Sequence, residues 1–294
     1  MNKNKSSLAS LKGSVRATAE PTDKPRKDRF HNFSWVLVLA MPALVFLILP
    51  VLPVIPMSFT AGHIIEFPPS EWGLSAYREV ISDTEWRDSI LLSLKVAALS
   101  ILFAVTGATF AAIGLSRIKF AGEGIFTALI LAPLAMPVVV LALGTFQFFI
   151  QVRLNGTILG LAIAHGVLGV PYAFLTVRAA LMKLDPSLIS AAVSLGAGPV
   201  DVLRWVYLPA ILPAILSGAL LVFVVSFDEV VIALFLAGPN TITFPVKLFT
   251  EVQFNLSPGI MAVSTMLLGF VVLFVVVVVT IIGARRVLEL KEGK

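Results

Sequence analysis

The chain has 294 residues, of which 58% are hydrophobic and only 13% are charged, about half of the charge that a soluble domain carries. A chain of this size with so few charged residues cannot form a polar surface around a water-soluble fold. A water-soluble fold is therefore excluded, and lipid is the predicted solvent. The absence of cysteine excludes disulfides and thiolate metal sites, and the three histidines, His31, His63 and His165, are too scattered to suggest a metal site. Much of the net charge of +5 lies in the N-terminal tail, which indicates membrane topology and not nucleic-acid binding.

Residues 1–33 form the first predicted element, a basic tail rich in Lys, Ser, Pro and Arg. The tail has no apolar face, so it is predicted to stay disordered in the cytoplasm or to lie on anionic lipid headgroups. Residues 34–286 are predicted to be the membrane domain, and residues 287–294 are predicted to be a short cytoplasmic tail.

A helix that crosses the hydrocarbon core needs about 20 mostly apolar residues. Six stretches of the chain meet this requirement, namely 35–59, 90–115, 125–152, 158–177, 208–237 and 260–284. The first is too long for the apolar region of a signal peptide, which spans about 7–15 residues, and no small-residue cleavage site ends it. Pro133 and Pro137 in the third stretch and Pro171 in the fourth are expected to kink their helices. The predicted fold class is therefore an all-α membrane protein with six spans.

The distribution of Lys and Arg predicts the orientation of these spans. With both termini in the cytoplasm, most of the 22 lysines and arginines fall on the cytoplasmic side, as the positive-inside rule requires. The segment between the first two spans then lies outside, and it carries more acidic than basic residues. Both termini are therefore predicted to be cytoplasmic.

Residues 184–207, between the fourth and fifth predicted spans, carry the strongest local signals in the chain. Asp185 suits the N-cap of a short helix and Pro186 its first helical position. Gly196 suits the end of that helix, because glycine adopts the left-handed conformation that often follows a helix. The loop is therefore predicted to contain a short cytoplasmic helix.

A second short helix is predicted to start at Gly198-Pro199 and to run to about Tyr207, with a break at Leu208-Pro209 before the membrane. The first helix is small, apolar and almost uncharged, so it is poorly suited to free solvent. It could fill a groove on a soluble partner, or it could rest on lipid as an interfacial helix. Composition by itself favours neither alternative.

The loop contains the run Ser190-Ala191-Ala192, followed after three residues by Gly196-Ala197 and later by Leu208-Pro209 and Pro213. This pattern resembles the EAA loop of permease subunits in binding-protein-dependent ABC importers of type I. In that family the loop is a coupling helix that docks into a cleft of the cytoplasmic ATPase. The resemblance implies that the ATPase is contacted by Ile189, Ser190, Ala191, Ala192, Leu195, Gly196 and Ala197. The family usually has Glu in place of Ser190, which puts in doubt any salt bridge from this position to the ATPase.

The resemblance also implies partners and a location. The partners would be an ABC ATPase dimer, a second homologous permease subunit and an extracytoplasmic substrate-binding protein, in a bacterial inner membrane. The chain has no P-loop sequence, so ATP is expected to bind to the partner subunit. No catalytic residue, cofactor or metal is expected in this chain.

Within the family, one segment points to a substrate branch. The motifs that carry this signal are Ser226-Phe227-Asp228-Glu229-Val230, Gly238-Pro239 and Phe244-Pro245. They look closest to the spermidine and putrescine permeases, although permeases for iron, thiamine, phosphonates or opines share parts of them. The resemblance therefore implies a small solute, and a polyamine in the first place.

Asp228 and Glu229 also stand out physically, because a carboxylate in a bilayer costs on the order of 2.5–3.5 kcal/mol. The helical rise places Asp228 roughly 30 Å from the cytoplasmic start of the fifth span, which is near the outer surface. One interpretation is a cation-attracting site at the mouth of a pathway. The alternative is a structural cap, or an ion pair with Lys247, with Arg153 or with a neighbouring subunit.

Three further residues are predicted to line the same pathway, namely Tyr172 in the fourth span and Phe146 and Gln147 in the third. Phe146 and Gln147 belong to an aromatic and amide cluster at the outer end of their span. Such a cluster is typical of an interfacial belt, and stacking against the alkyl chain of a ligand is the alternative. His165 is predicted to be a structural hydrogen-bonding residue between helices.

Two other classes of function fit the sequence less well than an importer subunit does. A secondary transporter would show an inverted repeat and ionisable residues near the midplane, and neither is evident in the sequence. A membrane-embedded enzyme would need a nucleophile, a metal motif or paired catalytic carboxylates, and the sequence shows none of these patterns. The importer subunit is therefore the predicted function.

Overall fold

The computed structural model describes residues 31–62, 64–117 and 120–292. Within these ranges the chain is mostly helical, with one isolated β-bridge between Thr60 and Trp72 and no strand. The predicted tail, residues 1–33, lies outside the described residues except for its last three, which begin the first helix. The all-α class predicted for the chain is therefore confirmed for its described part.

The chain divides into two compact units. Residues up to Pro53 form the first unit, whose described part holds α2 (His31–Ile48). The second unit starts at Val54 and holds all the remaining helices. In chain order these are α3 (Val54–Met57), α4 (Ser75–Ser82), α5 (Thr84–Arg117), α6 (Glu123–Ala135), α7 (Val138–Gln151), α8 (Ile158–Leu181), α9 (Pro186–Ser194), α10 (Pro199–Val202), a π-helical turn (Leu203–Tyr207), α11 (Leu208–Phe227), α12 (Val231–Leu236), α13 (Phe244–Phe254) and α14 (Pro258–Glu292).

Three helices of the described chain are long and apolar enough to cross a membrane, and the bent pair α6–α7 could add a fourth. The three are α5, α8 and the continuous stretch Pro199–Phe227, which ends with α11. They correspond to the second, fourth and fifth predicted spans. At the C-terminal end, α14 remains helical through Glu292, beyond the predicted limit of the membrane domain at residue 286.

The third predicted span, 125–152, is not one straight helix. It consists of α6 and α7, which meet at an angle of 105° around Met136 and Pro137. Met136 has an extended backbone, as expected for a residue before proline, because the proline ring disfavours the helical conformation there. Pro137 then caps α7 without donating a hydrogen bond of its own. The predicted kink at Pro137 is therefore confirmed, but it is a full break between two helices, and the pair is either one broken span or a re-entrant loop.

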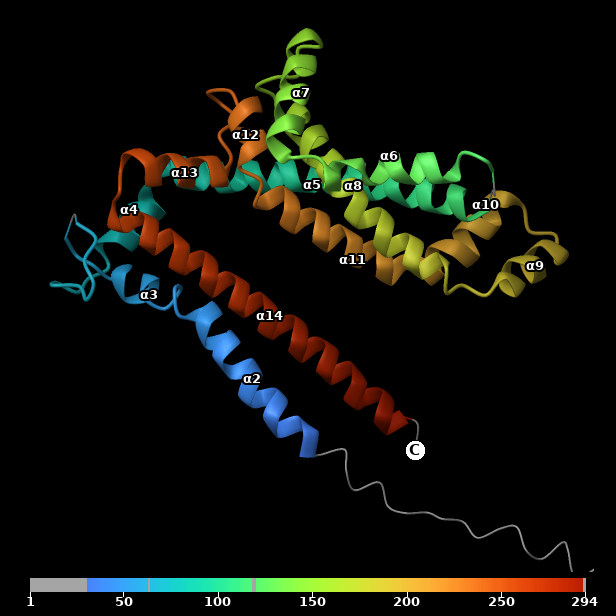
Figure 1. Cartoon of the computed structure of the whole chain (residues 1–294), viewed down its shortest axis with the longest axis horizontal. Helices are drawn as coiled ribbons and strands as arrows, with labels where there is room; N and C mark the ends of the chain where they lie inside the picture. Colours follow the sequence, from blue (N-terminus) through green and yellow to red (C-terminus); the bar gives the residue numbers. More distant parts are fainter. Residues whose placement is uncertain (1–30, 63, 118–119, 293–294) are drawn as a thin grey trace, which may run out of the picture. The chain divides into compact units, whose positions relative to one another are not determined.

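The second unit is organised around α5, α8 and α11, which run side by side (Figure 1). Along α5, Ala104, Ala108 and Ala112 recur at every fourth position and are almost fully buried. This spacing places the three small side chains on one face of the helix. Phe174 and Val222 of the neighbouring helices belong to the same core cluster. Small residues let helix backbones approach closely, which favours helix association in lipid.

A buried polar cluster links the same three helices. His165 of α8 lies with Nδ1 3.1 Å from both the carbonyl oxygen and the hydroxyl of Ser226 in α11. Ser100 of α5 donates a hydrogen bond to the Ala162 carbonyl of α8 at 2.9 Å. His165 is therefore an interhelical hydrogen-bonding residue, as predicted, and such bonds contribute roughly 0.6–1.7 kcal/mol each in membranes.

The close contact between α8 and α11 leaves little room for a side chain at Gly218. A Cβ atom there would lie 2.8 Å from Thr176 Oγ1 and 3.1 Å from the Ala173 Cα atom. We expect Gly218→Ala to lower the free energy of unfolding by about 1–3 kcal/mol, because the α8 backbone must shift. Thermal unfolding in detergent measures this effect. Gly107→Ala is the matched control, because no atom lies within 4 Å of its Cβ position, and equal destabilisation of both variants would contradict the prediction.

Candidate functional site

The loop between α8 and α11 folds by the local signals in its sequence. The Asp185 side chain caps α9 by accepting a hydrogen bond from the Ser187 N–H at 2.9 Å, and Pro186 is the first helical residue. At the other end Gly196 has a φ of +88°. The Gly196 N–H donates to the Val193 carbonyl and the Ala197 N–H to the Ala192 carbonyl, which is the Schellman arrangement. Both predicted ends of the helix are confirmed.

The second half of the loop differs from the prediction. The Asp201 carboxylate accepts a hydrogen bond from the Gly198 N–H at 3.1 Å, which caps α10. However, the chain does not break at Leu208-Pro209, because the π-helical turn carries the helix directly into α11. Pro209 cannot donate a backbone hydrogen bond, and the wider turn that precedes it changes the hydrogen-bond register where the helix would otherwise be interrupted.

The loop is held against the ends of α5 and α8. The Arg117 guanidinium, at the end of α5, lies 4.5 Å from the centroid of the Tyr207 ring. At the end of α8, Arg178 forms an ion pair with Glu123 at 3.0 Å and donates a hydrogen bond to Thr127 of α6 at 2.9 Å. These contacts anchor the residues from which the loop leaves the bundle and to which it returns.

α9 has two different faces. Ile189, Ala192 and Ala197 pack against the core cluster that α5, α8 and α11 form together with Val202 of α10 and Tyr207 of the π-helical turn. A neighbouring side of the helix carries Leu188, which is 52% exposed, and Leu195, which is 88% exposed. Together with the exposed Ala191 they form what we call the outer stripe (Leu188, Ala191 and Leu195). Its spacing of three and four residues places the stripe on one side of the helix.

The structure therefore divides the seven residues predicted for coupling. Ser190, Ala191, Leu195 and Gly196 are exposed, whereas Ile189, Ala192 and Ala197 are partly buried against the chain's own core. Leu188, which the prediction did not include, shares an exposed side of the helix with Ala191 and Leu195, and this spacing is visible in the sequence. Ser190 donates a hydrogen bond to the Pro186 carbonyl at 3.2 Å, and its side chain is exposed to solvent.

The predicted acidic pair lies in a break between two helices. α11 ends at Phe227 and α12 begins at Val231, so Asp228 and Glu229 follow the span, and the prediction of a continuous 208–237 span was wrong. Glu229 is half-buried and accepts a hydrogen bond from the Ile232 N–H at 2.9 Å, which caps α12. Asp228 is exposed. Lys247 pairs with other carboxylates.

The other predicted pathway residues are not gathered in one place. Phe146 of α7 is half-buried and packs on the cluster that contains Ile232 and Leu236 of α12. The same cluster joins α7 to α12. Gln147 is exposed, and Tyr172 is half-buried on α8.

In the described part of the chain, a groove of about 210 Å³ runs between α5 and the start of α11. Its lining is largely apolar and consists of Val105, Thr106, Thr109, Phe110, Ile113, Leu203, Leu208 and Ile215. None of the five predicted pathway residues lines this groove. The described residues also contain no group of three or more His, Asp or Glu side chains that could hold a metal ion.

Long apolar helices joined by a small helix with an exposed apolar stripe are typical of an integral membrane protein. Residues 104–287 match the family described as "Binding-protein-dependent transport system inner membrane component". This match covers more than half of the chain, and the chain belongs to this family of inner membrane transport proteins. The family predicted from the loop motif is therefore confirmed.

Two relatives carry names that state a substrate. The chain is 33% identical over 244 residues to the putrescine transport system permease protein PotI of Escherichia coli (strain K12), covering 81% of this chain and 86% of the relative. It is 30% identical over 176 residues to the spermidine/putrescine transport system permease protein PotC of the same strain, covering 60% of this chain and 67% of the relative. These relatives are transport permeases.

Solved structures support the fold. A bacterial ABC transporter involved in the import of alginate has a chain that matches with a TM-score of 0.66 at 18% identity, covering 86% of this chain and 97% of that one. The alginate transporter in complex with a pentasaccharide-bound periplasmic protein matches with a TM-score of 0.62 at 16% identity, covering 83% and 91%. At these identities the likeness concerns the fold alone.

The cap at Asp185 generates a prediction about α9. The Ser187 N–H stabilises the charged carboxylate, so the pKa of Asp185 lies below its ordinary value. The cap is therefore fully formed above the ordinary Asp pKa and is lost as pH falls through the lowered one. We expect Asp185→Ala to speed amide exchange in the first turn of α9, whereas Asp185→Asn keeps an acceptor and stays near the wild type. Hydrogen exchange with mass spectrometry measures this, and equal exchange in both variants would contradict it.

Proposed function

We propose that this chain is the permease subunit of an ATP-driven importer for polyamines such as spermidine or putrescine. Family membership supports the transport role, and the 33% identity to a putrescine permease over 81% of the chain carries the substrate class. A polyamine is a flexible polycation, so its path should offer carboxylates and aromatic rings in place of water. Asp228, Glu229 and Phe146 supply both kinds of group around the break that follows α11.

The same proposal includes the partners and the topology. An ABC ATPase dimer binds ATP, a second homologous permease completes the pathway, and an extracytoplasmic binding protein delivers the solute. The family description and the periplasmic protein of the related structure support the binding protein. Six spans, with both termini in the cytoplasm, consist of α2, α5, the α6–α7 pair, α8, α11 and α14, and the distribution of Lys and Arg supports this orientation.

The two faces of α9 suggest how ATPase movement reaches the pathway. The outer stripe (Leu188, Ala191 and Leu195) docks into the ATPase, in the helix-in-groove mode. The inner face, with Ile189 and Ala192, packs on the core cluster at the end that α10 and the π-helical turn form, and this turn continues into α11. When ATP closes the ATPase dimer, displacement of α9 therefore moves the bundle as a packed body and changes which side of the membrane the pathway faces.

The outer stripe can be tested with charge. We expect Leu188→Glu and Leu195→Glu to reduce co-purification of the ATPase by roughly tenfold or more, because a carboxylate would be buried in an apolar groove without a partner. Leu256→Glu is the matched control, since Leu256 is 67% exposed just after α13. Normal co-purification and ATPase stimulation in both stripe variants would contradict the coupling role. A charge at Ala192 would disturb the chain's own packing as well as docking, because Ala192 is partly buried against the core cluster.

The acidic pair can be tested without changing its shape. Glu229→Gln keeps an oxygen that can cap α12 but removes the charge. Asp228→Asn removes the charge at the exposed position and keeps the size of the side chain. An ammonium about 4 Å from a carboxylate gains roughly 4 kcal/mol at an effective dielectric near 20, and solvent screening reduces this at the surface. We therefore expect uptake of radiolabelled spermidine by the reconstituted complex to fall about tenfold in each variant.

Complex assembly, followed by co-purification of the ATPase, is expected to stay unchanged in the Asp228 and Glu229 variants. Reduced assembly with unchanged uptake per complex would favour a structural role for the pair. A wild-type complex that moves neither spermidine nor putrescine would overturn the polyamine assignment. An opine, a phosphonate, iron or thiamine would then be the next substrates to test in the same importer.

A further inference from the structure

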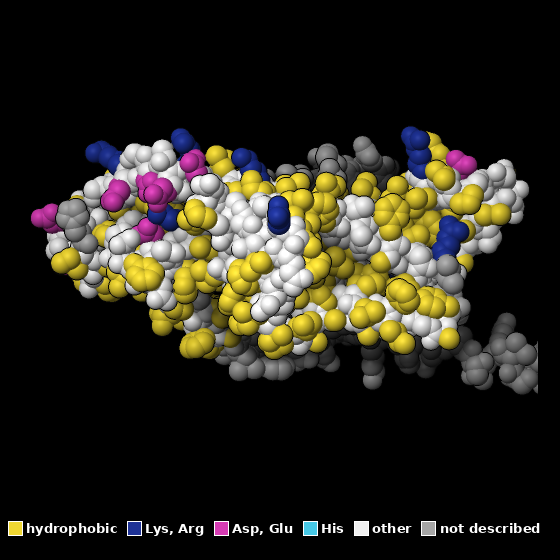
Figure 2. Space-filling view, turned by 90° about the horizontal axis from the view of Figure 1, so that it is seen from above, with side chains coloured by type: hydrophobic (Ala, Val, Ile, Leu, Met, Phe, Trp, Pro, Cys, Tyr) yellow, Lys and Arg dark blue, Asp and Glu magenta, His cyan; other side chains and the backbone are white. Residues whose placement is uncertain are grey.

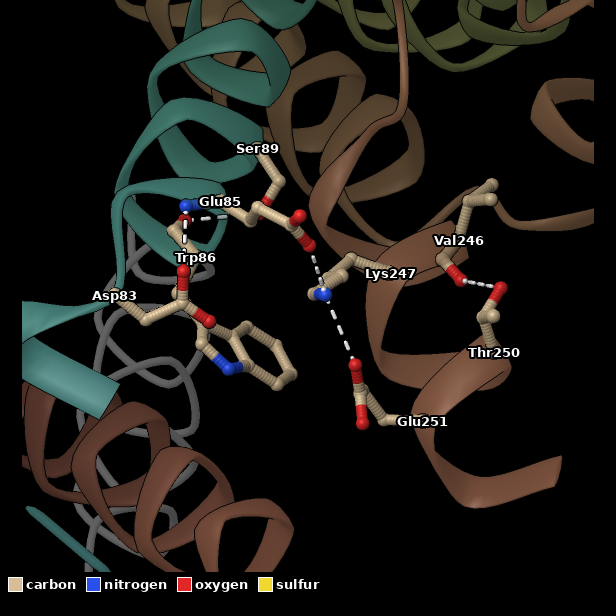
Figure 3. A network of polar contacts seen from close by, with 8 residues as sticks. All are labelled: Asp83, Glu85, Trp86, Ser89, Val246, Lys247, Thr250 and Glu251. Atoms are coloured by element: carbon tan, nitrogen blue, oxygen red, sulfur yellow. Dashed lines mark hydrogen bonds and ion pairs between the residues drawn. The ribbon is translucent and has the colours of Figure 1, made fainter. Parts of the chain in front are cut away.

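An ammonium group of the chain is already held in the kind of site that a polyamine requires. Lys247 Nζ lies 2.5 Å from Glu85 Oε2 and 2.9 Å from Glu251 Oε1 (Figure 3). It also lies 5.6 Å from the centroid of the Trp86 ring. Two carboxylates and an indole face are the groups that bind an alkylammonium ion in proteins. We call this the ammonium site (Glu85, Trp86 and Glu251).

The ammonium site is built by residues from distant parts of the chain. Glu85 and Trp86 lie in the first turn of α5, whereas Glu251 shares α13 with Lys247, four residues away. α13 is fixed on α5 by a hydrogen bond from the Phe244 N–H to the Ser93 hydroxyl at 2.7 Å. This hydrogen bond holds the start of α13 beside α5 independently of the Lys247 side chain.

The ammonium site lies at the end of α5 away from the coupling loop. Arg117, the last residue of α5, contacts Tyr207 of the loop, and it lies 32 positions after Glu85 in the same helix, roughly 48 Å along the helix. On the face shown in Figure 2, most of the visible Asp and Glu side chains gather at the end where α4 and the start of α5 lie.

The charges of the ammonium site do not balance. One ammonium faces two carboxylates, so a negative charge remains when Lys247 is in place. Burial by itself would lower the pKa of Lys247, but hydrogen bonds and attraction to Glu85 and Glu251 raise it above its ordinary value, so the ammonium stays charged. Lys247 and Glu251 are largely covered, with side chains 14% and 15% exposed, whereas Glu85 is 72% exposed. An approaching cation therefore meets Glu85 first.

We propose that Lys247 competes with the substrate for the ammonium site. Lys247 occupies the site until the terminal ammonium of a polyamine displaces it. This inference rests on the proposed function. The exchange replaces one ammonium by another in the same contacts, so it binds the substrate weakly. A transit site must be favourable enough to enter and weak enough to leave. The return of Lys247 then releases the substrate toward the pathway.

Displacement can be measured directly in the wild-type complex with its partners in nanodiscs. The probe is acetylation of lysine by an N-hydroxysuccinimide ester, read by mass spectrometry during a spermidine titration. Lys183 is exposed near the coupling loop and serves as the internal reference, because spermidine itself consumes reagent. We expect the ratio of Lys247 to Lys183 labelling to rise several-fold with spermidine. The uncharged control 1,8-octanediol should leave the ratio unchanged, and an unchanged or falling ratio with spermidine overturns the proposal.

Two variants separate competition from a purely structural ion pair. Lys247→Met removes the competing charge, so we expect KM for spermidine and kcat to fall several-fold together, because substrate binds more tightly and leaves more slowly. Lys247→Arg keeps the ion pair and holds the carboxylates more firmly, so KM should rise several-fold. A structural role predicts that Lys247→Met lowers complex yield or thermal stability with KM unchanged, and this result overturns the proposal.

The failure of this inference and of the proposed function can be told apart. Spermidine uptake by the wild-type complex tests the proposed function alone. Uptake with an unchanged Lys247 labelling ratio overturns the competitor role and leaves the polyamine importer standing. A ratio that rises without any uptake supports displacement at the ammonium site and overturns the polyamine importer.

Discussion

In a lipid bilayer the tails around a helix are as apolar as its own side chains, so burial of apolar surface cannot hold helices together as it does in water. Association then depends on close contact and on hydrogen bonds between helices. The α5–α8–α11 bundle meets this constraint with small residues. Ala104, Ala108 and Ala112 present a flat face on α5, and Gly218 lets α11 approach the α8 backbone. The buried hydrogen bonds of His165 and Ser100 fix how α8 is positioned against α11 and α5.

The rest of the second unit can be understood as attachments to the two ends of this bundle. At one end, α9 lies on the core by its inner face and leaves the outer stripe open. At the other end, α12 packs on α7, and α13 is pinned to the start of α5. Elements that move as packed bodies transmit displacement, because close-packed interfaces resist gradual deformation. The bundle therefore has a separate attachment at each end, as the proposed coupling between an ATPase and the pathway requires.

Charge is used sparingly and in specific places. Glu229 caps a helix in the break after α11, and Lys247 joins α13 to α5 through Glu85. Both groups lie where the chain leaves its long apolar helices, so their charges avoid the full cost of the hydrocarbon core.

The sequence by itself determined the membrane class, the family and the local structure of the loop between α8 and α11. Composition, runs of apolar residues and caps such as Asp185 and Gly196 act over a few neighbouring residues, so their consequences can be read without a structure. Only the tertiary structure decided that Ala192 faces inward and that Leu188 joins the outer stripe. It also decided the 105° bend between α6 and α7 and the pairing of Lys247 with Glu85. Residues 162 positions apart in the chain make that ion pair, and no local pattern specifies which distant charge a helix end will meet.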